Sequence, residues 1–131
     1  MRKRLGVLLA AGLAATAASV VPAAADASSP TNLTLTKTGT SGAGPVNKQV
    51  TLQCEPTGGT HPTAQDACTQ LIAVDGQFAL IPRASGYGCG GDWAPITVTV
   101  TGTWRRQPVY FTKTYGNDCE ASVGSSFVFR F

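Results

Sequence analysis

Polar and apolar residues alternate over several short segments of the chain. Leucine alternates with threonine over residues 32–37, and valine alternates with threonine over residues 96–104. A two-residue period rich in β-branched side chains is typical of a β-strand with one buried face. The same reasoning applied along the whole chain predicts five strands, at residues 32–37, 46–54, 96–104, 108–115 and 126–131.

Two details of these strands lead to expectations of their own. Phe127, Phe129 and Phe131 fall on one face of the last predicted strand, so we expect all three in the core. Gly102 interrupts the strand with the clearest alternation, and glycine inside a strand often marks a bulge. We therefore expect a bulge at Gly102.

One segment has helical spacing instead. Small and apolar residues recur three and four positions apart, which places them on one face of a helix: Ala64, Ala67, Cys68, Leu71 and Ile72. Thr63 stands where an N-cap is expected, and Gly76 suits the left-handed conformation that ends many helices. A helix packed on an antiparallel sheet makes an α+β domain.

The N-terminus has the pattern of a secretory signal peptide. Three basic residues precede an uncharged run rich in Ala and Leu, which is followed by Pro22 and three alanines. The run is short and weakly hydrophobic for a membrane anchor. We expect a signal peptide at residues 1–25, with cleavage after Ala25 or alternatively after Ala27. Residues 26–131 would then be a single secreted, extracellular domain.

The net charge of +3 belongs to this N-terminal segment. Beyond residue 25, seven basic residues balance seven acidic ones. Binding to phosphate needs a clustered excess of Lys and Arg, so the composition argues against nucleic acid as a partner. The remaining sequence also has no run of residues apolar enough to predict a membrane span.

The four cysteines all lie in the predicted mature domain. An even number of cysteines in a small exported protein indicates two disulfides. The short Cys-x2-4-Cys pairs of zinc sites are absent from the sequence, so we expect neither a metal nor another cofactor. Four cysteines allow three pairings, of which the nearest-neighbour pairing, Cys54–Cys68 and Cys89–Cys119, is the simplest.

Residue types suited to catalysis are sparse. His61 is the only histidine, and it lies beside Pro62 in a predicted turn, without a Gly-x-Ser-x-Gly motif in the chain. A serine hydrolase needs a histidine base next to its nucleophile and an acid that orients it. We therefore expect a structural role for His61 and do not expect an enzyme.

A glycine-rich segment, residues 85–95, precedes the strand with the clearest alternation. It contains four glycines together with Tyr87 and Trp93, a composition that suits neither a helix nor a central strand. A disulfide at Cys89 would fix one point of it, and loops held on a rigid scaffold often present binding surfaces. A plain surface turn is the alternative interpretation.

Residues 54–71 carry a specific motif: Cys-x-Pro, a short gap, Gly-x-His-Pro, four residues, Ala-Cys and a leucine shortly after. This motif resembles the signature of the Streptomyces subtilisin inhibitor family, and the likeness continues over residues 98–104, 117–120 and 125–131. The resemblance implies an α+β fold, with a five-stranded antiparallel sheet and one or two helices packed on one face. It also implies the two nearest-neighbour disulfides, a homodimer formed through the sheet, and secreted inhibitors of serine proteases, mainly subtilisin-like ones.

By the same resemblance, the glycine-rich segment is a reactive loop that an extracellular serine protease binds as it would a substrate. Asn117 matches an asparagine that supports this loop from behind. The scissile bond would be Gly91–Asp92, and the loop positions would be Gly88 at P4, Cys89 at P3, Gly90 at P2, Gly91 at P1, Asp92 at P1′ and Trp93 after it.

The chain departs from the family pattern at the positions that select the protease. Inhibitory members usually carry Met or Lys at P1, whereas this chain has Gly91 there and Gly88 at P4. An empty S1 pocket forgoes about 1.5–3 kcal/mol that a buried large apolar side chain contributes. The alternative hypothesis is a non-inhibitory extracellular binding module on the same scaffold, with Tyr87 and Trp93 as anchors.

Overall fold

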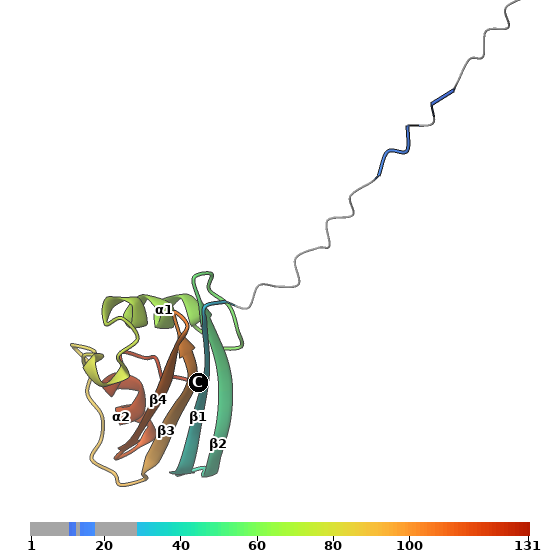
Figure 1. The fold of residues 1–131 in the computed structure, drawn as a ribbon. Helices are drawn as coiled ribbons and strands as arrows, with labels where there is room; N and C mark the ends of the chain where they lie inside the picture. The colour runs from blue at the N-terminus through green and yellow to red at the C-terminus, as the bar shows by residue number, and fades with distance from the viewer. Residues whose placement is uncertain (1–10, 13, 18–28) are drawn as a thin grey trace, which may run out of the picture.

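The computed structural model describes residues 11–12, 14–17 and 29–131. The predicted signal peptide and both predicted cleavage positions therefore lie almost entirely outside the described residues. Within the described residues, no helix is long and apolar enough to cross a membrane. The chain folds in the order β1 (Thr31–Ser41), β2 (Gly44–Cys54), α1 (Ala64–Ala73), the short 3-10 helix η1 (Phe78–Leu80), β3 (Ile96–Trp104), β4 (Gln107–Tyr115) and α2 (Asp118–Gly124) (Figure 1).

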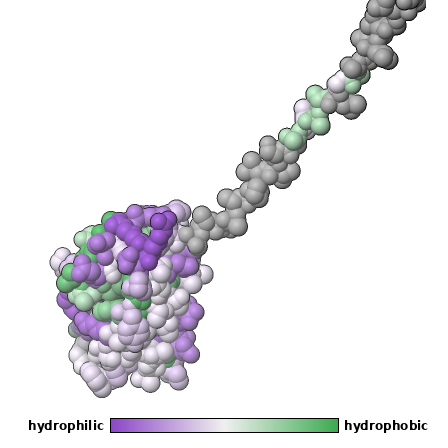
Figure 2. Space-filling view, viewed as in Figure 1, coloured by the Kyte–Doolittle hydropathy of each residue, from purple (hydrophilic) through white to green (hydrophobic). Residues whose placement is uncertain are grey.

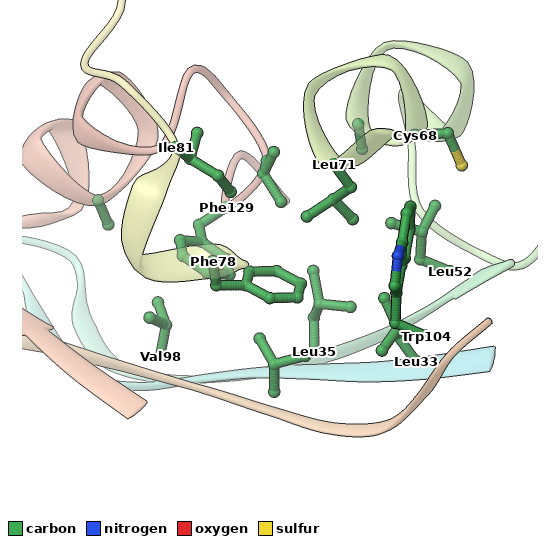
Figure 3. Close-up of a cluster of buried hydrophobic side chains, with 14 of the residues drawn as sticks. Leu33, Leu35, Leu52, Cys68, Leu71, Phe78, Ile81, Val98, Trp104 and Phe129 are labelled. Carbon is green, nitrogen blue, oxygen red and sulfur yellow. The ribbon is translucent and has the colours of Figure 1, made fainter. Parts of the chain in front are cut away.

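The described strands form one antiparallel sheet of four in the order β2-β1-β3-β4. The helices all lie on one face of this sheet (Figures 1 and 3). Because side chains alternate along a strand, one set of residues on β1 and β3 points to the helices and is fully buried: Leu33, Leu35, Val98 and Val100. Leu71 of α1 and Phe78 of η1 close the core from the other side. The predicted α+β class is confirmed.

The fifth predicted strand is wrong. Residues 126–131 form no ladder, because Ser126 and Phe127 have φ angles of 48° and 68°, which an extended strand does not allow. The backbone instead turns back on α2, where the N–H of Phe127 donates to Ser122 at 2.8 Å. Phe129 is buried as expected, but Phe127 and Phe131 are only partly buried.

The predicted bulge at Gly102 is also wrong, because the pairing of β3 with β1 and β4 runs through this residue without a break. Gly102 has a φ of 127°, and a Cβ here would collide with the carbonyl oxygen of Asn32 on β1. Glycine is therefore needed for close approach of the two strands rather than for an extra residue.

Helix α1 forms where it was predicted and buries Ala67, Cys68 and Leu71, but Ile72, expected on the same inner face, is 43% exposed. Gly76 has a φ of 72° and donates its N–H to the carbonyl of Leu71 at 2.9 Å, which closes the helix end. Thr63 does precede the helix, but its side chain makes no capping hydrogen bond. The disulfide Cys54–Cys68 ties the helix to β2, and with Cys89–Cys119 it confirms the nearest-neighbour pairing.

The outer face of the sheet, which points away from the helices, is polar and uncharged. Its centre pairs threonine with threonine between β1 and β3: Thr34 with Thr101, Thr36 with Thr99 and Thr38 with Thr97. None of the outward positions on these described strands carries a charge. The space-filling view is likewise pale over the lower half of the domain, and green patches gather around the helices (Figure 2).

Candidate functional site

The glycine-rich segment forms an exposed loop between η1 and β3. It runs along the edge of the domain past α2 to the end of the sheet where β3 begins (Figure 1). Residues 90–93 are all exposed, and Trp93 keeps 78% of its surface accessible. A binding partner therefore reaches this part of the backbone without any rearrangement of the scaffold.

One disulfide and one amide side chain hold the middle of the loop. The disulfide Cys89–Cys119 joins it to α2. The side-chain amide of Asn117 donates to the carbonyl oxygens of Gly90 and Asp92, at 3.1 Å and 3.0 Å. Since these carbonyls lie on either side of Gly91, one side chain fixes the direction of the chain across that residue.

Asn117 is itself fixed in place. It is 5% exposed and occupies the N-cap of α2, where its side-chain oxygen accepts the N–H of Glu120 at 2.9 Å. Such caps satisfy a backbone donor that the helix leaves free. The same amide group thus caps the helix with its oxygen and holds the loop with its nitrogen.

The end of the loop joins the sheet. Ala94 donates its N–H to the carbonyl of Gly116 at 2.9 Å. The ring of Trp93 lies over Gly116, where a Cβ would be 3.7 Å from it. Gly39 of β1 lies against the carbonyl of Pro95, and a side chain here would clash with it. Glycine at position 39 therefore lets the loop lie close to the sheet, whereas a Cβ on Gly116 would make only ordinary contact with Trp93.

The start of the loop is tied to α2 by an ion pair. Arg83 and Glu120 form a two-pronged salt bridge, with the second contact at 3.3 Å. The hydrogen bond from Arg83 lowers the pKa of the Glu120 carboxyl below its ordinary value, and the reciprocal contact raises the pKa of Arg83. The N–H of Ala84 also donates to Val123 at 2.9 Å.

The glycines of the loop differ in what they require. Gly86 has a φ of 82°, so it adopts a left-handed conformation that favours glycine. Gly88 and Gly91 have no positive φ and open space where a Cβ would stand. Their backbone therefore accepts side chains, and the glycines present smooth, side-chain-free positions to a partner. Behind the loop lies a cavity of about 130 Å³ that Asp92 helps to line.

A buried lysine supports the loop from inside the core, and the sequence analysis missed it. Lys37 of β1 is 1% exposed, and its ammonium donates to Asp118 at 2.7 Å and to the carbonyl of Phe129 at 3.0 Å. Asp118 lies between Asn117 and Cys119, the two residues that hold the loop. The sequence feature that could have revealed it is the alternation along the strand, which places the lysine on the same face as Leu33 and Leu35.

His61 has the structural role predicted for it. It is 5% exposed, and its Nε2 lies 2.8 Å from the carbonyl of Val128, while its Nδ1 accepts the N–H of Thr63 at 3.0 Å. These contacts correspond to a neutral imidazole with the proton on Nε2. Within the described residues, no group of three or more His, Cys, Asp or Glu side chains is placed to hold a metal ion.

Fold and site together define a small, disulfide-bonded α+β domain that presents an exposed loop fixed at its start, middle and end. The sequence profile described as subtilisin inhibitor-like matches residues 27–117. The chain belongs to the subtilisin inhibitor-like family.

Individual relatives agree with this assignment. The protease inhibitor SIL-V2 of Streptomyces orinoci is 45% identical over 95 residues, which cover 71% of this chain and 87% of that protein. The subtilisin inhibitor of Streptomyces violaceus is 44% identical over 81 residues, or 60% of this chain and 56% of the relative. Sermetstatin of Streptomyces caespitosus, solved in complex with subtilisin of Bacillus licheniformis, matches with a TM-score of 0.61 and 28% identity, covering 76% of this chain and 97% of the neighbour.

Proposed function

We propose that this protein is a secreted inhibitor of serine endopeptidases, subtilisin-like or related, and that its reactive bond is Gly91–Asp92. One observation carries the assignment. The Asn117 amide holds the carbonyls of Gly90 and Asp92, and the adjacent disulfide fixes Cys89. The exposed bond between them is thereby presented in one orientation, as a substrate-like inhibitor requires.

Preorganisation is the physical basis of the inhibition. A flexible peptide loses conformational freedom when a protease binds it, whereas a loop already held in shape loses little. The protease would pair with the exposed loop backbone by strand addition, the mode in which extended peptides add to a sheet edge. Side chains at P4 and P1 contribute nothing here, because Gly88 and Gly91 occupy these positions.

The same tethers oppose turnover. If the protease cuts Gly91–Asp92, the disulfide and Asn117 keep the new amine of Asp92 beside the acyl-enzyme. Religation then competes with hydrolysis, because a held reactant has a high effective concentration. The ion pair of Arg83 with Glu120 anchors the other side of the cut and limits the separation of the two ends.

A protease panel tests the proposal. The purified exported protein is titrated against subtilisin-, trypsin-, chymotrypsin- and elastase-like enzymes, and we expect tight, stoichiometric inhibition of at least one. Inhibition of none would reject the inhibitor and leave the non-inhibitory binding module. Reduction of Cys89–Cys119 should convert the inhibitor into a substrate. The matched control is a variant in which Cys54–Cys68 has been removed by substitution.

Secretion and dimerisation belong to the same proposal. We propose that residues 1–25 direct export and are removed. The uncharged outer face of the sheet is suited to pair with a second copy, since two identical faces without charges do not repel each other. Sedimentation of the purified protein tests the dimer, and Thr34→Arg, at the centre of this face, should yield monomers without loss of fold.

A further inference from the structure

Two exposed aromatic residues flank the side-chain-free stretch of the loop. Tyr87 and Trp93 keep 58% and 78% of their surfaces accessible, although large apolar side chains usually gain by burial. Between them, Gly88, Gly90 and Gly91 offer backbone only, and Cys89 is committed to its disulfide. Apart from the exposed carboxylate of Asp92, the side-chain contacts available to a partner therefore come from Tyr87 and Trp93.

The two aromatic rings are not equivalent. The ring of Tyr87 packs edge-on against Phe127, with 4.9 Å between ring centroids, so part of its surface serves the scaffold. Trp93 rests against the bare backbone of Gly116 and turns most of its ring to solvent. At 78% exposed, Trp93 keeps most of its apolar surface available to be covered by a partner, as an interface anchor requires.

Asp92 and Trp93 follow the proposed reactive bond on its leaving-group side, and both are exposed. Asp92 is one of the residues that line the cavity behind the loop, and its Oδ1 lies 3.2 Å from the position of a Cβ on Gly90. This carboxylate therefore lies beside the loop backbone at Gly90, while the residue as a whole stays exposed. The next residue, Trp93, is the first after the proposed reactive bond that offers a large apolar surface.

A protease with a deep S1 pocket gains nothing from Gly91, because its pocket stays unfilled. A protease whose S1 subsite is shallow or filled by its own side chains loses no binding energy when P1 is glycine instead of a large residue. We propose that the loop is specialised for a serine endopeptidase with a small S1 subsite and an apolar subsite at P2′ that receives Trp93. This inference rests on the proposed inhibitory function and names the class of its target.

Two proteases of one fold but different S1 volume provide the test: an elastase-type enzyme with a small S1 subsite and a chymotrypsin-type enzyme with a large one. We expect the unaltered protein to inhibit the elastase-type enzyme more tightly. Trp93→Ala should weaken that inhibition by about thirtyfold or more, as for an interface hot spot. Tyr87→Ala, the matched aromatic control, should weaken it much less. Circular dichroism checks that both variants are folded.

The results of these experiments distinguish failure of the proposed target class from failure of the proposed inhibitory function. Equal or tighter inhibition of the chymotrypsin-type enzyme, or an unchanged inhibition constant for Trp93→Ala, would overturn the target class while the inhibitor stands. Gly91→Met should gain inhibition of the chymotrypsin-type enzyme. If only this variant inhibits, the scaffold is inhibitory and the target class is wrong; if neither protein inhibits any protease, both proposals fall.

Discussion

The ammonium of Lys37 lies 2.7 Å from the Asp118 carboxylate, which joins the centre of the sheet to the first turn of α2. The lysine is 1% exposed, whereas the aspartate is 49% exposed. Phe131 adds its ring, 4.8 Å from the ammonium. A charge this deeply buried is stable only with its partners, so the helix that holds the loop is coupled to the sheet.

The cost of breaking this pair should depend on which partner is removed. Asp118→Ala leaves a buried ammonium without its carboxylate and should reduce the free energy of unfolding by about 3 kcal/mol. Lys37→Met leaves a half-exposed carboxylate that water can solvate, and should cost about 1 kcal/mol. Urea denaturation checks both. The double variant should be no less stable than Asp118→Ala alone; strictly additive losses would contradict the coupling.

Asn117 should show two separable roles. Asn117→Asp keeps an oxygen to cap α2 but loses the amide donor to the carbonyls of Gly90 and Asp92. Asn117→Ala loses the cap as well, which costs about 1 kcal/mol more. We expect both variants to be cut faster at Gly91–Asp92 under excess protease, measured by mass spectrometry, while only Asn117→Ala loses the capping energy. Cleavage of Asn117→Asp at the unaltered rate would show that the amide does not protect the bond.

The loop and sheet glycines should respond oppositely to substitution. Gly91→Ala meets open space with an ordinary φ and should change the free energy of unfolding by less than about 1 kcal/mol. Gly102→Ala must keep a φ of 127° and meets the carbonyl of Asn32, and should cost roughly 2 kcal/mol or more. Thermal unfolding compares the two. A loss for Gly91→Ala as large as that for Gly102→Ala would refute the open geometry of the loop.

Acid should loosen the start of the loop through Glu120. Its folded-state pKa is lowered by Arg83 below the ordinary value of 4.5. The ion pair therefore contributes its stability above that ordinary value, and the contribution is lost as pH falls through the lowered pKa. The difference in Tm between the unaltered protein and Glu120→Gln should be present at neutral pH and disappear in acid. A difference that persists in acid would mean that the carboxylate charge is not responsible.

Much of the fold could be predicted from local sequence patterns. Helix α1 has both a repeating apolar face and a glycine at its end, and β1 and β3 alternate clearly, so period and turn chemistry agree there. The C-terminal segment shows the limit of this reasoning. Phe127, Phe129 and Phe131 also alternate, but a two-residue period does not reveal whether a neighbouring strand is present to pair with.

Composition indicated that residues 85–95 are a candidate binding loop, but only the family motif singled out one bond within it. Neither composition nor spacing distinguishes Gly91–Asp92 from the other bonds of the loop. The contacts that hold the loop join residues far apart in sequence: Lys37 and Asp118 are separated by 81 positions. Such partners depend on how the layers pack, which a single sequence does not specify pair by pair.

The strand order β2-β1-β3-β4 has a consequence for a molecule cut at Gly91–Asp92. The N-terminal fragment keeps one complete hairpin, β1 with β2, and the C-terminal fragment keeps the other, β3 with β4. The two halves meet along the β1–β3 ladder and are linked by Cys89–Cys119. The domain is thus organised as two complementary halves, and separately produced fragments should reassemble into one folded protein.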